Sequence, residues 1–330
     1  MKLRDFDYIL PEQLIAQYPL KERGQAKLLV LDRAAKSITH CRFCDIYKFF
    51  EPSDVLAINN TKVFKARLRG KKTTGGAVEV LLIKQQADGI WESMVSNARR
   101  VRPGTQIFLG PDAYVKVIEK TGSRCLVAFN ISAHEIIAKY GIVPLPHYIK
   151  RSAITNDEKY YQTTFAEKIG SIAAPTAGLH FTKEIIKEII NQGIETAEIT
   201  LHIGPGTFKP IRTENIEEHM MEPEYFEISE KVVNTVNNAQ RVIGVGTSVC
   251  RALETYAQTK KTFGLADLFI YPGHRFKIID CLITNFHLPC STPLLLVCAF
   301  AGKNLIFKAY EEAIQKKYRF LSYGDAMLII

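Results

Sequence analysis

The chain has 330 residues, of which 47% are hydrophobic and 23% charged, as is typical of a globular protein of one or two domains. No stretch approaches the ~18 uninterrupted apolar residues that a membrane-spanning helix needs. The start of the chain also lacks the apolar run of a signal peptide, so we expect a cytoplasmic protein without membrane contact. The formal net charge of +9 favours an anionic partner, of which nucleic acid is the commonest large one.

The seven cysteines are odd in number and scattered, which favours free thiols in a reducing compartment. Cys41 and Cys44 form the one close pair. A zinc site would need a second pair or histidines at matched spacing, and Cys281 and Cys290 do not supply it. We therefore expect no metal.

Taken in chain order, the hydrophobic pattern changes twice. Residues 10–60 mix short helices and strands. Between 62 and 150, short apolar runs such as "AVEVLLI" and "RCLVAFN" alternate with turn signals such as "TTGG" and "TGS", a pattern typical of a small antiparallel barrel or sandwich. From about 155, strands alternate with helices, which predicts an α/β sheet. The predicted fold class is therefore a larger α/β domain (1–61 and 151–330) with a small antiparallel β-barrel domain inserted at 62–150.

Positive charge gathers in the segment predicted to form the barrel. "KARLRGKK" places Lys65, Arg67 and Arg69 at alternate positions, which would put three cations on one face of a strand. "ARRVRPG" adds Arg99 and Arg100. The pattern suits a nucleic-acid surface, and it equally suits an edge strand that charge keeps from aggregating.

The stretch "SIAAPTAGLHFT" (171–182) is a turn of small residues that precedes a helix. Isoleucines at helical spacing in "TKEIIKEIINQG" predict that helix, with Thr182 as its N-cap and Gly193 at its end. His180 then lies two residues before the cap, after small residues that let the backbone approach a ligand. The alternative is a structural turn whose histidine bonds to the backbone.

Two further loops combine glycine, hydroxyl groups and histidine. "TLHIGPGTFKPIR" contains His202, Gly204 and Gly206, and "VIGVGTSVCRALE" lies between a predicted strand and a predicted helix. Neither completes a dinucleotide-binding fingerprint, and no Walker A motif is present. Arg251 and Glu254 share a helix face, where they could form a substrate site or a surface ion pair.

A fourth loop, "LITNFHLPCSTP", ends an apolar strand at Asn285 and His287. Thr292 would then cap a helix with Pro293 at its first position. Because ligands of open α/β sheets bind at the carboxyl ends of strands, three histidines at such positions favour a catalytic site. The final stretch "YRFLSYGDAMLII" supplies aromatic side chains that could stack on bases, or a strand that packs on the core.

Together these stretches closely resemble the S-adenosylmethionine:tRNA ribosyltransferase-isomerases of queuosine biosynthesis. The resemblance follows the family's order along nearly the whole chain and rests on "NNTKVFKARLRG" (59–70), "VPLPHYIKR" (143–151), "YYQTTFAEKIGSIAAPTAGLHFT" (160–182), "TLHIGPGTFKPIR" (200–212), "HMMEPEYFEI" (219–228), "VGTSVCRALE" (245–254), "FIYPGHRFKIID" (269–280), "LITNFHLPCSTPLLLVCAFAG" (282–302) and "YRFLSYGDAML" (318–328). The departure at Thr247-Ser248-Val249-Cys250, where the family often has two threonines and a serine, affects local packing more than chemistry.

The resemblance implies transfer of the ribosyl portion of S-adenosylmethionine to 7-aminomethyl-7-deazaguanine at the wobble position of a tRNA. The ribosyl unit is isomerised to give epoxyqueuosine, and adenine and methionine are released. S-adenosylmethionine is then a co-substrate, no other cofactor or metal is implied, and the partner is a tRNA. We expect the protein to be a monomer.

The residue roles that follow are chemical hypotheses. The sulfonium acidifies the C5′ protons of the ribose, so a base is needed, and His180 is the first candidate; His202 or His287 would protonate the leaving adenine. Arg251, or the N–H groups near Gly246 and Thr247, would hold the methionine carboxylate. The other expected substrate contacts are Thr176, Gly178, Gly204, Gly206, Thr207, Phe208, Glu254, Asn285, Tyr323 and Asp325, with Tyr323 or Phe208 stacking on the modified base. The expected tRNA-binding residues are Lys65, Arg67, Arg69, Arg99 and Arg100.

Two other functions remain open at this point. A different adenosylmethionine-dependent RNA enzyme, such as a methyltransferase, would release S-adenosylhomocysteine, and the absence of a clean glycine-rich loop after the first strand argues against it. A non-catalytic RNA-binding protein would show no adenosylmethionine turnover, and the histidine-bearing loops argue against that function.

Overall fold

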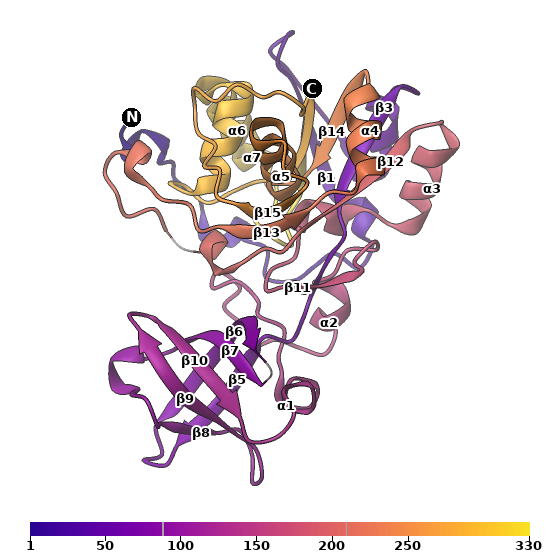
Figure 1. Ribbon diagram of the computed structural model, residues 1–330. Coiled ribbons are helices and arrows are strands. Elements are labelled where there is room, and N and C mark those ends of the chain that lie inside the picture. The colour runs from indigo at the N-terminus through magenta and orange to yellow at the C-terminus, as the bar shows by residue number, and fades with distance from the viewer. Residues whose placement is uncertain (88, 209) are drawn as a thin grey trace.

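A computed structural model of the chain describes residues 1–87, 89–208 and 210–330, without the side chains of residues 207 and 208. The protein has two parts, a large twisted sheet covered by helices and a small closed barrel below it (Figure 1). The barrel is built from a continuous piece of chain, and both ends of the chain belong to the large part.

The large part is organised around a nine-stranded sheet. Its strands, in spatial order, are β15 (Phe263–Ala266), β13 (Glu224–Glu227), β12 (Glu195–Leu201), β3 (Asp54–Asn59), β14 (Arg241–Val245), β16 (Cys281–Asn285), β17 (Ala326–Ile329), β1 (Lys27–Asp32) and β2 (Ser37–Arg42). The four central strands β12, β3, β14 and β16 are parallel, and β17 is antiparallel to β16. The carboxyl ends of the central strands therefore meet at one edge of the sheet.

Both faces of this sheet are covered, which explains the continuous apolar runs of its central strands. Along β1, Leu29 and Leu31 pack into one hydrophobic cluster while Leu28 and Val30 pack into another on the opposite face. The first cluster includes α4 (Glu230–Asn238), α5 (Thr247–Thr259), α6 (Thr292–Ala301) and α7 (Lys303–Gln315); the second includes α3 (Lys183–Asn191).

The helix starts follow the capping rules, with one difference from expectation. The Thr182 side chain accepts a hydrogen bond from the Ile185 N–H at 3.3 Å, as predicted for the start of α3. For α6, however, the cap is Ser291, which accepts from the Leu294 N–H at 3.4 Å, and not Thr292. Ser291 has the extended backbone of a cap and Thr292 is already helical, so Pro293 is the second helical residue.

The small part is a closed six-stranded barrel in which every neighbouring pair of strands is antiparallel. Its strands, in spatial order, are β10 (Arg124–Phe129), β7 (Ile90–Val95), β6 (Ala77–Ala87), β5 (Arg67–Lys72), β8 (Gln106–Phe108) and β9 (Tyr114–Thr121). The predicted fold class is confirmed. All six strands fall inside the predicted insertion, although its limits, 62 and 150, stay a prediction. Lys65 precedes β5, so the three cations do not share one strand.

Short elements complete the chain. These are α1 (Ala133–Tyr140), α2 (Asp157–Tyr160), the parallel pair β4 (Thr61–Val63) and β11 (Lys168–Ser171), and the 3₁₀ helices η1 (Leu3–Phe6), η2 (Glu12–Leu14), η3 (Arg23–Gln25), η4 (Phe43–Phe49), η5 (Ala98–Arg100), η6 (Thr176–His180), η7 (Pro205–Phe208) and η8 (Ile216–Glu218). An ion pair joins the barrel to the large part, from Arg124 on β10 to Glu222 at 3.1 Å.

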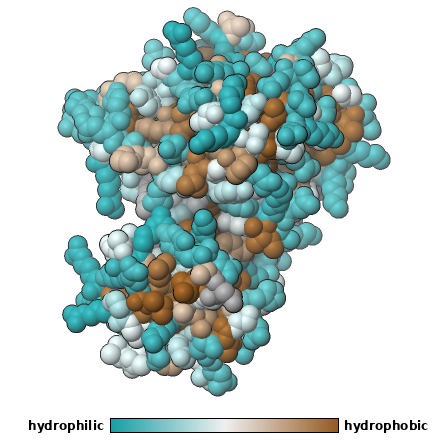
Figure 2. All heavy atoms as spheres, in the orientation of Figure 1, coloured by the Kyte–Doolittle hydropathy of each residue, from teal (hydrophilic) through white to brown (hydrophobic). Residues whose placement is uncertain are grey.

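A hollow separates the barrel from the sheet, and apolar side chains lie on both sides of it (Figure 2). On the sheet side, Leu265 of β15 and Ile169 of β11 are 60% and 67% exposed. All seven cysteines are free, as the sequence predicted.

Within the described ranges, no single helix has the length and apolar composition needed to cross a membrane. α6 and α7 meet these criteria only together, across a bend of 114°.

Candidate active site

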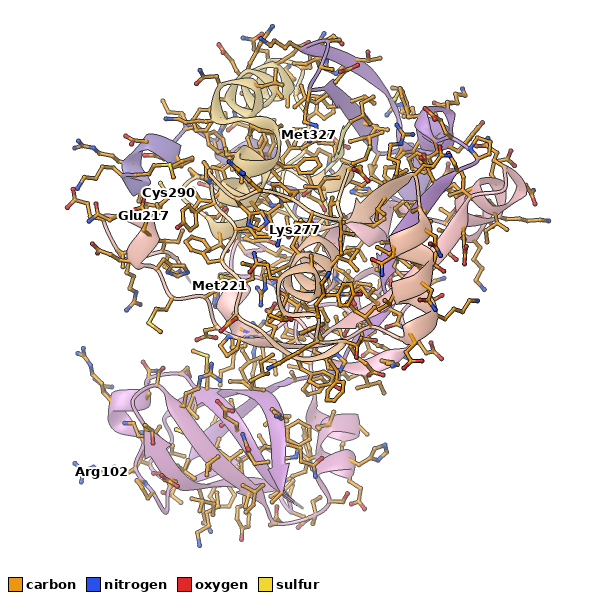
Figure 3. All side chains as sticks on the ribbon, turned by 45° about the horizontal axis from the view of Figure 1, so that its top comes forward. Arg102, Glu217, Met221, Lys277, Cys290 and Met327 are labelled. Atoms are coloured by element: carbon orange, nitrogen blue, oxygen red, sulfur yellow. The ribbon has the colours of Figure 1, made fainter. Side chains whose placement is uncertain are left out.

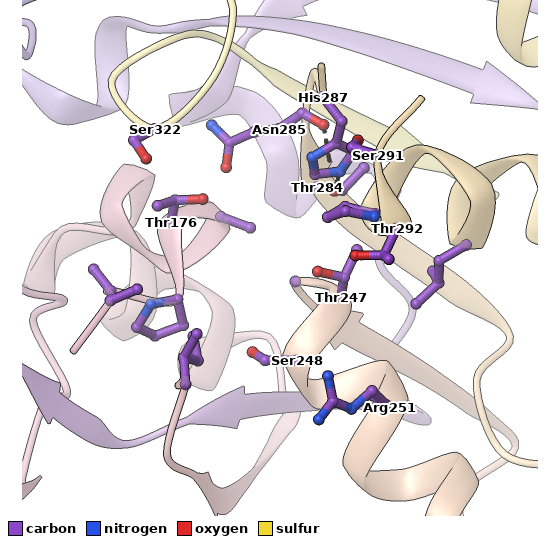
Figure 4. Close-up of a pocket in the computed structure, with 18 of the residues that line it drawn as sticks. Thr176, Thr247, Ser248, Arg251, Thr284, Asn285, His287, Ser291, Thr292 and Ser322 are labelled. Carbon is purple, nitrogen blue, oxygen red and sulfur yellow. Dashed lines mark hydrogen bonds between the residues drawn. The ribbon is translucent and has the colours of Figure 1, made fainter. Parts of the chain in front are cut away.

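A narrow pocket of about 150 Å³ opens at the carboxyl ends of β14 and β16. This is the position at which open α/β sheets bind their ligands. Besides Tyr148 and Tyr161, its polar lining comes from five chain segments and consists of Thr176, Glu224, Gly246, Thr247, Ser248, Arg251, Thr284, Asn285, His287, Ser291, Thr292 and Ser322 (Figure 4 labels all of these twelve except Glu224 and Gly246). Most of these side chains are neutral hydroxyl or amide groups, so the pocket suits a polar ligand of mixed character.

Two helix N-termini converge on one end of this pocket. α5 begins at Thr247 and α6 at Thr292, and both threonines line the pocket (Figure 4). The residue before α5, Gly246, has a φ of +91°, which a residue with a side chain rarely adopts. The first N–H groups of a helix lack intrahelical partners and the helix dipole is positive there, so this end favours an anion.

A buried cation lies beside the same end. Arg251 is 7% exposed; its Nη2 pairs with Glu224 Oε2 at 2.8 Å and donates to the Ala266 carbonyl at 2.9 Å. Its Nε makes no hydrogen bond to any residue that the structure describes. Arg251 can therefore still donate one hydrogen bond. The surface ion pair between Arg251 and Glu254, one of the two alternatives that the sequence left open, does not form, because Arg251 pairs with Glu224 on β13.

His287 is the one expected catalytic histidine that lines this pocket. Its Nε2 lies 2.8 Å from Thr284 Oγ1, a contact drawn in Figure 4 that fixes the ring. Burial lowers the pKa of His287 to about 3. The imidazole is therefore neutral at physiological pH.

His180, the first candidate for the base, does not fit that role. It is 5% exposed and does not line the pocket. Its Nε2 lies 3.1 Å from Asn285 Nδ2, and its ring packs on Phe43 at a centroid distance of 5.0 Å. Burial, with smaller contributions from Arg23 and Arg319, lowers its pKa to about 3. His180 therefore belongs to the wall behind the pocket, where it contacts a side chain and not the backbone.

His202 lies in a second, larger cleft of about 1310 Å³ between the barrel and the sheet. Its Nδ1 lies 2.8 Å from Thr61 Oγ1, and its ring stacks on Tyr225 at 5.9 Å. A Cβ on Gly170 would lie 2.6 Å from the ring, so only glycine fits beneath it. Burial, and then Lys168, lower the pKa of His202. The three histidines thus occupy three different environments and do not form one cluster.

The pocket and the cleft adjoin. Ile203 and Glu224 line both, and Glu224 accepts the Gly204 N–H at 2.8 Å, so the carboxylate spans the boundary between the two cavities. Gly204 lines the cleft. Two reactants held in these cavities would therefore meet near Glu224.

Three other expected substrate contacts are buried in structural networks and line neither cavity. Asp325 is 2% exposed and accepts the N–H groups of Lys27 and Arg319 at 2.9 and 2.7 Å. The Tyr323 hydroxyl donates to Asp157 at 2.9 Å, which makes that ring unsuitable for stacking on a base. Glu254, the third, is described below.

Of the glycines expected to contact substrate, Gly204 and Gly246 line a cavity, whereas Gly178 and Gly206 do not. A Cβ on Gly178 would lie 2.8 Å from the Phe165 ring, and one on Gly206 would lie 2.8 Å from Glu222 Cβ. Neither glycine lines a cavity, so each accommodates a protein side chain and not a ligand. The expectations for the Thr207 and Phe208 side chains lie outside the described part of the chain.

The expected tRNA-binding cations differ in their surroundings. Lys65 pairs with Glu158 at 2.6 Å, and both Arg67 and Arg69 pair with Glu79, at 3.0 and 3.4 Å. Arg67 is also half-buried, so its charge is neutralised by Glu79 within the barrel and is not presented to a ligand. Arg99 and Arg100 are exposed on η5, and Arg102 just beyond them points outward from the barrel (Figure 3).

Sequence reasoning missed Tyr161, Ser322 and Glu224, all of which line the pocket. Each of them belongs to a stretch that carries the family resemblance, and that was the one signal available. No three His, Cys, Asp or Glu side chains gather as metal ligands in ranges 1–87, 89–208 and 210–330.

Comparison with known proteins decides the family. A family model described as "Queuosine biosynthesis protein" matches residues 3–329. The chain belongs to the queuosine biosynthesis protein family. Curated relatives named S-adenosylmethionine:tRNA ribosyltransferase-isomerase, an enzyme name, include those of Sulfurihydrogenibium sp. (strain YO3AOP1) and Aquifex aeolicus (strain VF5), which are 49% and 46% identical. In both cases the match covers 100% of each chain.

A solved structure of this family has a similar fold. It is an S-adenosylmethionine tRNA ribosyltransferase from Thermotoga maritima, with 34% identity and a TM-score of 0.57 over 99% of this chain and 100% of that one. The family resemblance inferred from the sequence is therefore confirmed.

The environment of Glu254 indicates that this residue stabilises the fold and does not bind substrate, and this can be tested. It is fully buried and accepts the N–H groups of Lys277, Ile278 and Ile279 at 2.9–3.2 Å. Burial raises its pKa, but the His274 ring, whose Nε2 lies 3.5 Å from Glu254 Oε2, and the hydrogen bonds from these N–H groups outweigh burial and hold the pKa below the usual 4.5. A lowered pKa in the folded state stabilises the fold above the unfolded pKa, and this stabilisation is lost as the pH falls.

We therefore predict that Glu254→Gln lowers the free energy of unfolding by about 1–3 kcal/mol at neutral pH. The variant should also lose less stability than the wild type when the pH falls below 4.5. Urea unfolding at several pH values measures both effects, with Glu311→Gln on the exposed face of α7 as the control. Unchanged stability together with weakened substrate binding would return Glu254 to the role expected from sequence.

Proposed function

We propose that the protein transfers and isomerises the ribosyl moiety of S-adenosylmethionine onto 7-aminomethyl-7-deazaguanine at the wobble position of a tRNA. The product is epoxyqueuosine-tRNA, and adenine and methionine are released. Family membership over residues 3–329 supports the reaction class. The observation that carries the assignment to this pocket is its anion-binding end, formed by two helix starts and Arg251, beside a neutral polar end.

This division matches the parts of S-adenosylmethionine. The methionine carboxylate suits the first N–H groups of α5, from Thr247 on, and the Thr292 N–H at the start of α6. The Nε of Arg251, which has no partner among the described residues, is a further donor. The adenosine then extends toward Thr176 and Asn285 at the neutral end. S-adenosylmethionine is consumed as a co-substrate, and the reaction uses no further cofactor.

His287 takes the role of base in this arrangement. The positive sulfur makes the C5′ protons of the ribose acidic, and a neutral imidazole in the pocket can accept one. The contact with Thr284 holds the ring in place. His180 contacts Asn285 and not the substrate, so it acts as a positioning residue.

The tRNA occupies the larger cleft. The wobble base lies in a single-stranded loop and can be turned outward to stack on an aromatic ring. Tyr225 is 39% exposed in the cleft and lies against His202, so this pair replaces Tyr323 as the stacking surface. Phosphates bind the exposed cations of the barrel, above all Arg99 and Arg100.

Product analysis tests the reaction. Purified protein is mixed with S-adenosylmethionine and a tRNA that carries 7-aminomethyl-7-deazaguanine, and the products are identified by mass spectrometry. We expect adenine, methionine and a heavier wobble nucleoside. S-adenosylhomocysteine would indicate a methyltransferase, and tight RNA binding without turnover would indicate a binding protein; either result contradicts the proposal.

Replacement of His287 tests the base. We predict that His287→Ala lowers kcat by a factor of about 10²–10⁴, because general base catalysis is lost, while KM for S-adenosylmethionine changes little. The variant should also stop exchange of the C5′ protons with deuterated solvent. His147→Ala, at an exposed position, is the control. Near-normal turnover by His287→Ala would remove His287 from this role.

Replacement of the exposed arginines tests the tRNA surface. We predict that the double variant Arg99→Ala, Arg100→Ala weakens tRNA binding and lowers the slope of log K against log salt concentration by about 2. The matched control, Lys187→Ala with Lys308→Ala, removes two exposed charges from α3 and α7. Fluorescence anisotropy at several salt concentrations gives both values. Equal slopes for the two double variants would place the tRNA on another surface.

A further inference from the structure

One buried amide has an acceptor atom without a protein partner. Asn285 is 2% exposed at the end of β16 and lines the pocket. Its Nδ2 contacts His180 Nε2 at 3.1 Å and the carbonyls of Leu321 and Asp325 at 3.2 and 3.4 Å. Carbonyl oxygens only accept hydrogen bonds, so these contacts fix the nitrogen on that side. Oδ1 has no hydrogen-bond partner in the described part of the chain, and in Figure 4 it points into the pocket toward Thr176.

A second unpartnered polar atom lies in the same pocket. Tyr161 is 1% exposed, and its hydroxyl makes no hydrogen bond to a described residue. Ser322 and the Ala174 backbone lie near this hydroxyl, but neither meets the geometry of a hydrogen bond to it, and the Ser322 Oγ is bonded to the Tyr148 hydroxyl at 2.7 Å. Burial raises the pKa of Tyr161 well above its usual value, so the hydroxyl keeps its hydrogen. Ser322 directly follows Leu321, which binds Asn285, so the two unpartnered atoms flank one short segment.

Two such atoms at one end of a pocket require an explanation. A buried polar group without a partner costs about 1–3 kcal/mol, and native proteins contain few of them. A ligand that supplies a donor to Asn285 Oδ1 and an acceptor to the Tyr161 hydroxyl would remove both costs. The polar edge of adenine has these groups side by side, an exocyclic N6 amino donor and the N1 acceptor.

We propose that Asn285 Oδ1 and the Tyr161 hydroxyl form a subsite that recognises the N1–N6 edge of the adenine of the adenosylmethionine substrate. This inference rests on the proposed function. A guanine-type base also pairs a donor with an acceptor, but a base carried by tRNA needs the wide cleft, whereas these atoms lie in the narrow pocket that also contains the anion-binding end. The His180 contact keeps the Asn285 amide in the orientation that recognition needs.

Hydrogen bonding at N1 and N6 also bears on the chemistry. Adenine has to leave with its bonding electrons, and donation by the Tyr161 hydroxyl to N1 draws electron density away from the ribosyl bond. The subsite therefore supports departure of the base as well as selection of the substrate.

The test compares S-adenosylmethionine with its inosine counterpart, in which an oxygen replaces the N6 amino group and N1 carries a hydrogen. Both groups on that edge are then reversed. Isothermal titration calorimetry on the full chain measures binding to the wild type, Tyr161→Phe, Asn285→Ala and Tyr148→Phe. The last variant is the control: Tyr148 also lines the pocket, but the hydroxyl that the variant removes already has a partner in Ser322.

We expect the wild type to bind the adenine compound at least about tenfold more tightly. Tyr161→Phe should lose about 3- to 10-fold of affinity for S-adenosylmethionine and most of the preference, without loss of stability, since its hydroxyl has no protein partner. Asn285→Ala should lose the preference too. Tyr148→Phe should lose stability and keep the preference of the wild type.

A wild-type preference retained by Tyr161→Phe overturns the subsite, while the product analysis above still decides the proposed function separately. The subsite is also overturned if free 7-aminomethyl-7-deazaguanine competes with S-adenosylmethionine for the wild type but not for Tyr161→Phe. That result would assign the two atoms to the acceptor base. Failure of the wild type to bind S-adenosylmethionine contradicts the proposed function itself.

Discussion

The buried side chain of Asn285 connects the segments on which the pocket depends. Through one amide nitrogen it joins the carboxyl end of β16 to the turn that precedes β17 and to His180 at the end of η6. β16 and β17 are neighbours in the sheet, but η6 comes from an earlier part of the chain. Loss of these contacts would leave buried donors and acceptors unpaired on three segments at once. The amide nitrogen therefore sets the wall of the pocket, and the amide oxygen, which has no partner among the described residues, is available to a ligand.

The two cavities give the molecule a division of labour that suits a transfer between two reactants. The narrow pocket at the sheet edge can enclose a small zwitterionic molecule, and the wide cleft beside the barrel can admit a macromolecule. Glu224 lines both cavities and is paired with Arg251, so the charge at the boundary is balanced before any substrate binds. An inserted barrel is a direct way to build such a cleft, because it places a second wall opposite the carboxyl ends of the strands.

The fold class and the pocket-forming loops could be predicted from the sequence, because both depend on local patterns. Alternating apolar runs with turn residues between them indicated the barrel, and apolar strands that end in glycine, hydroxyl and histidine residues indicated the sheet edge. The fate of individual side chains could not be predicted in the same way. His180 turns inward because Phe43 and Asn285, from other parts of the chain, enclose it. The carboxylates of Glu254 and Asp325 accept hydrogen bonds from backbone N–H groups, and only the folded structure brings these N–H groups close to them.

The sequence also could not show which cations are neutralised by a neighbouring carboxylate. Alternation of Arg67 and Arg69 was visible, but strand register places Glu79 opposite Arg69 on β6, and the carboxylate pairs with both arginines. Tyr161 could not be recognised, because an unpartnered hydroxyl is a property of the packed structure.

We propose that S-adenosylmethionine binds in the narrow pocket, with its carboxylate at the helix starts and its adenine at Asn285 and Tyr161. A crystal structure with S-adenosylmethionine bound tests it most directly. We expect the methionine carboxylate within about 3 Å of N–H groups at the starts of α5 and α6, and the adenine edge against Asn285 and Tyr161. S-adenosylmethionine found instead in the cleft between barrel and sheet, or with its orientation reversed in the pocket, would contradict it.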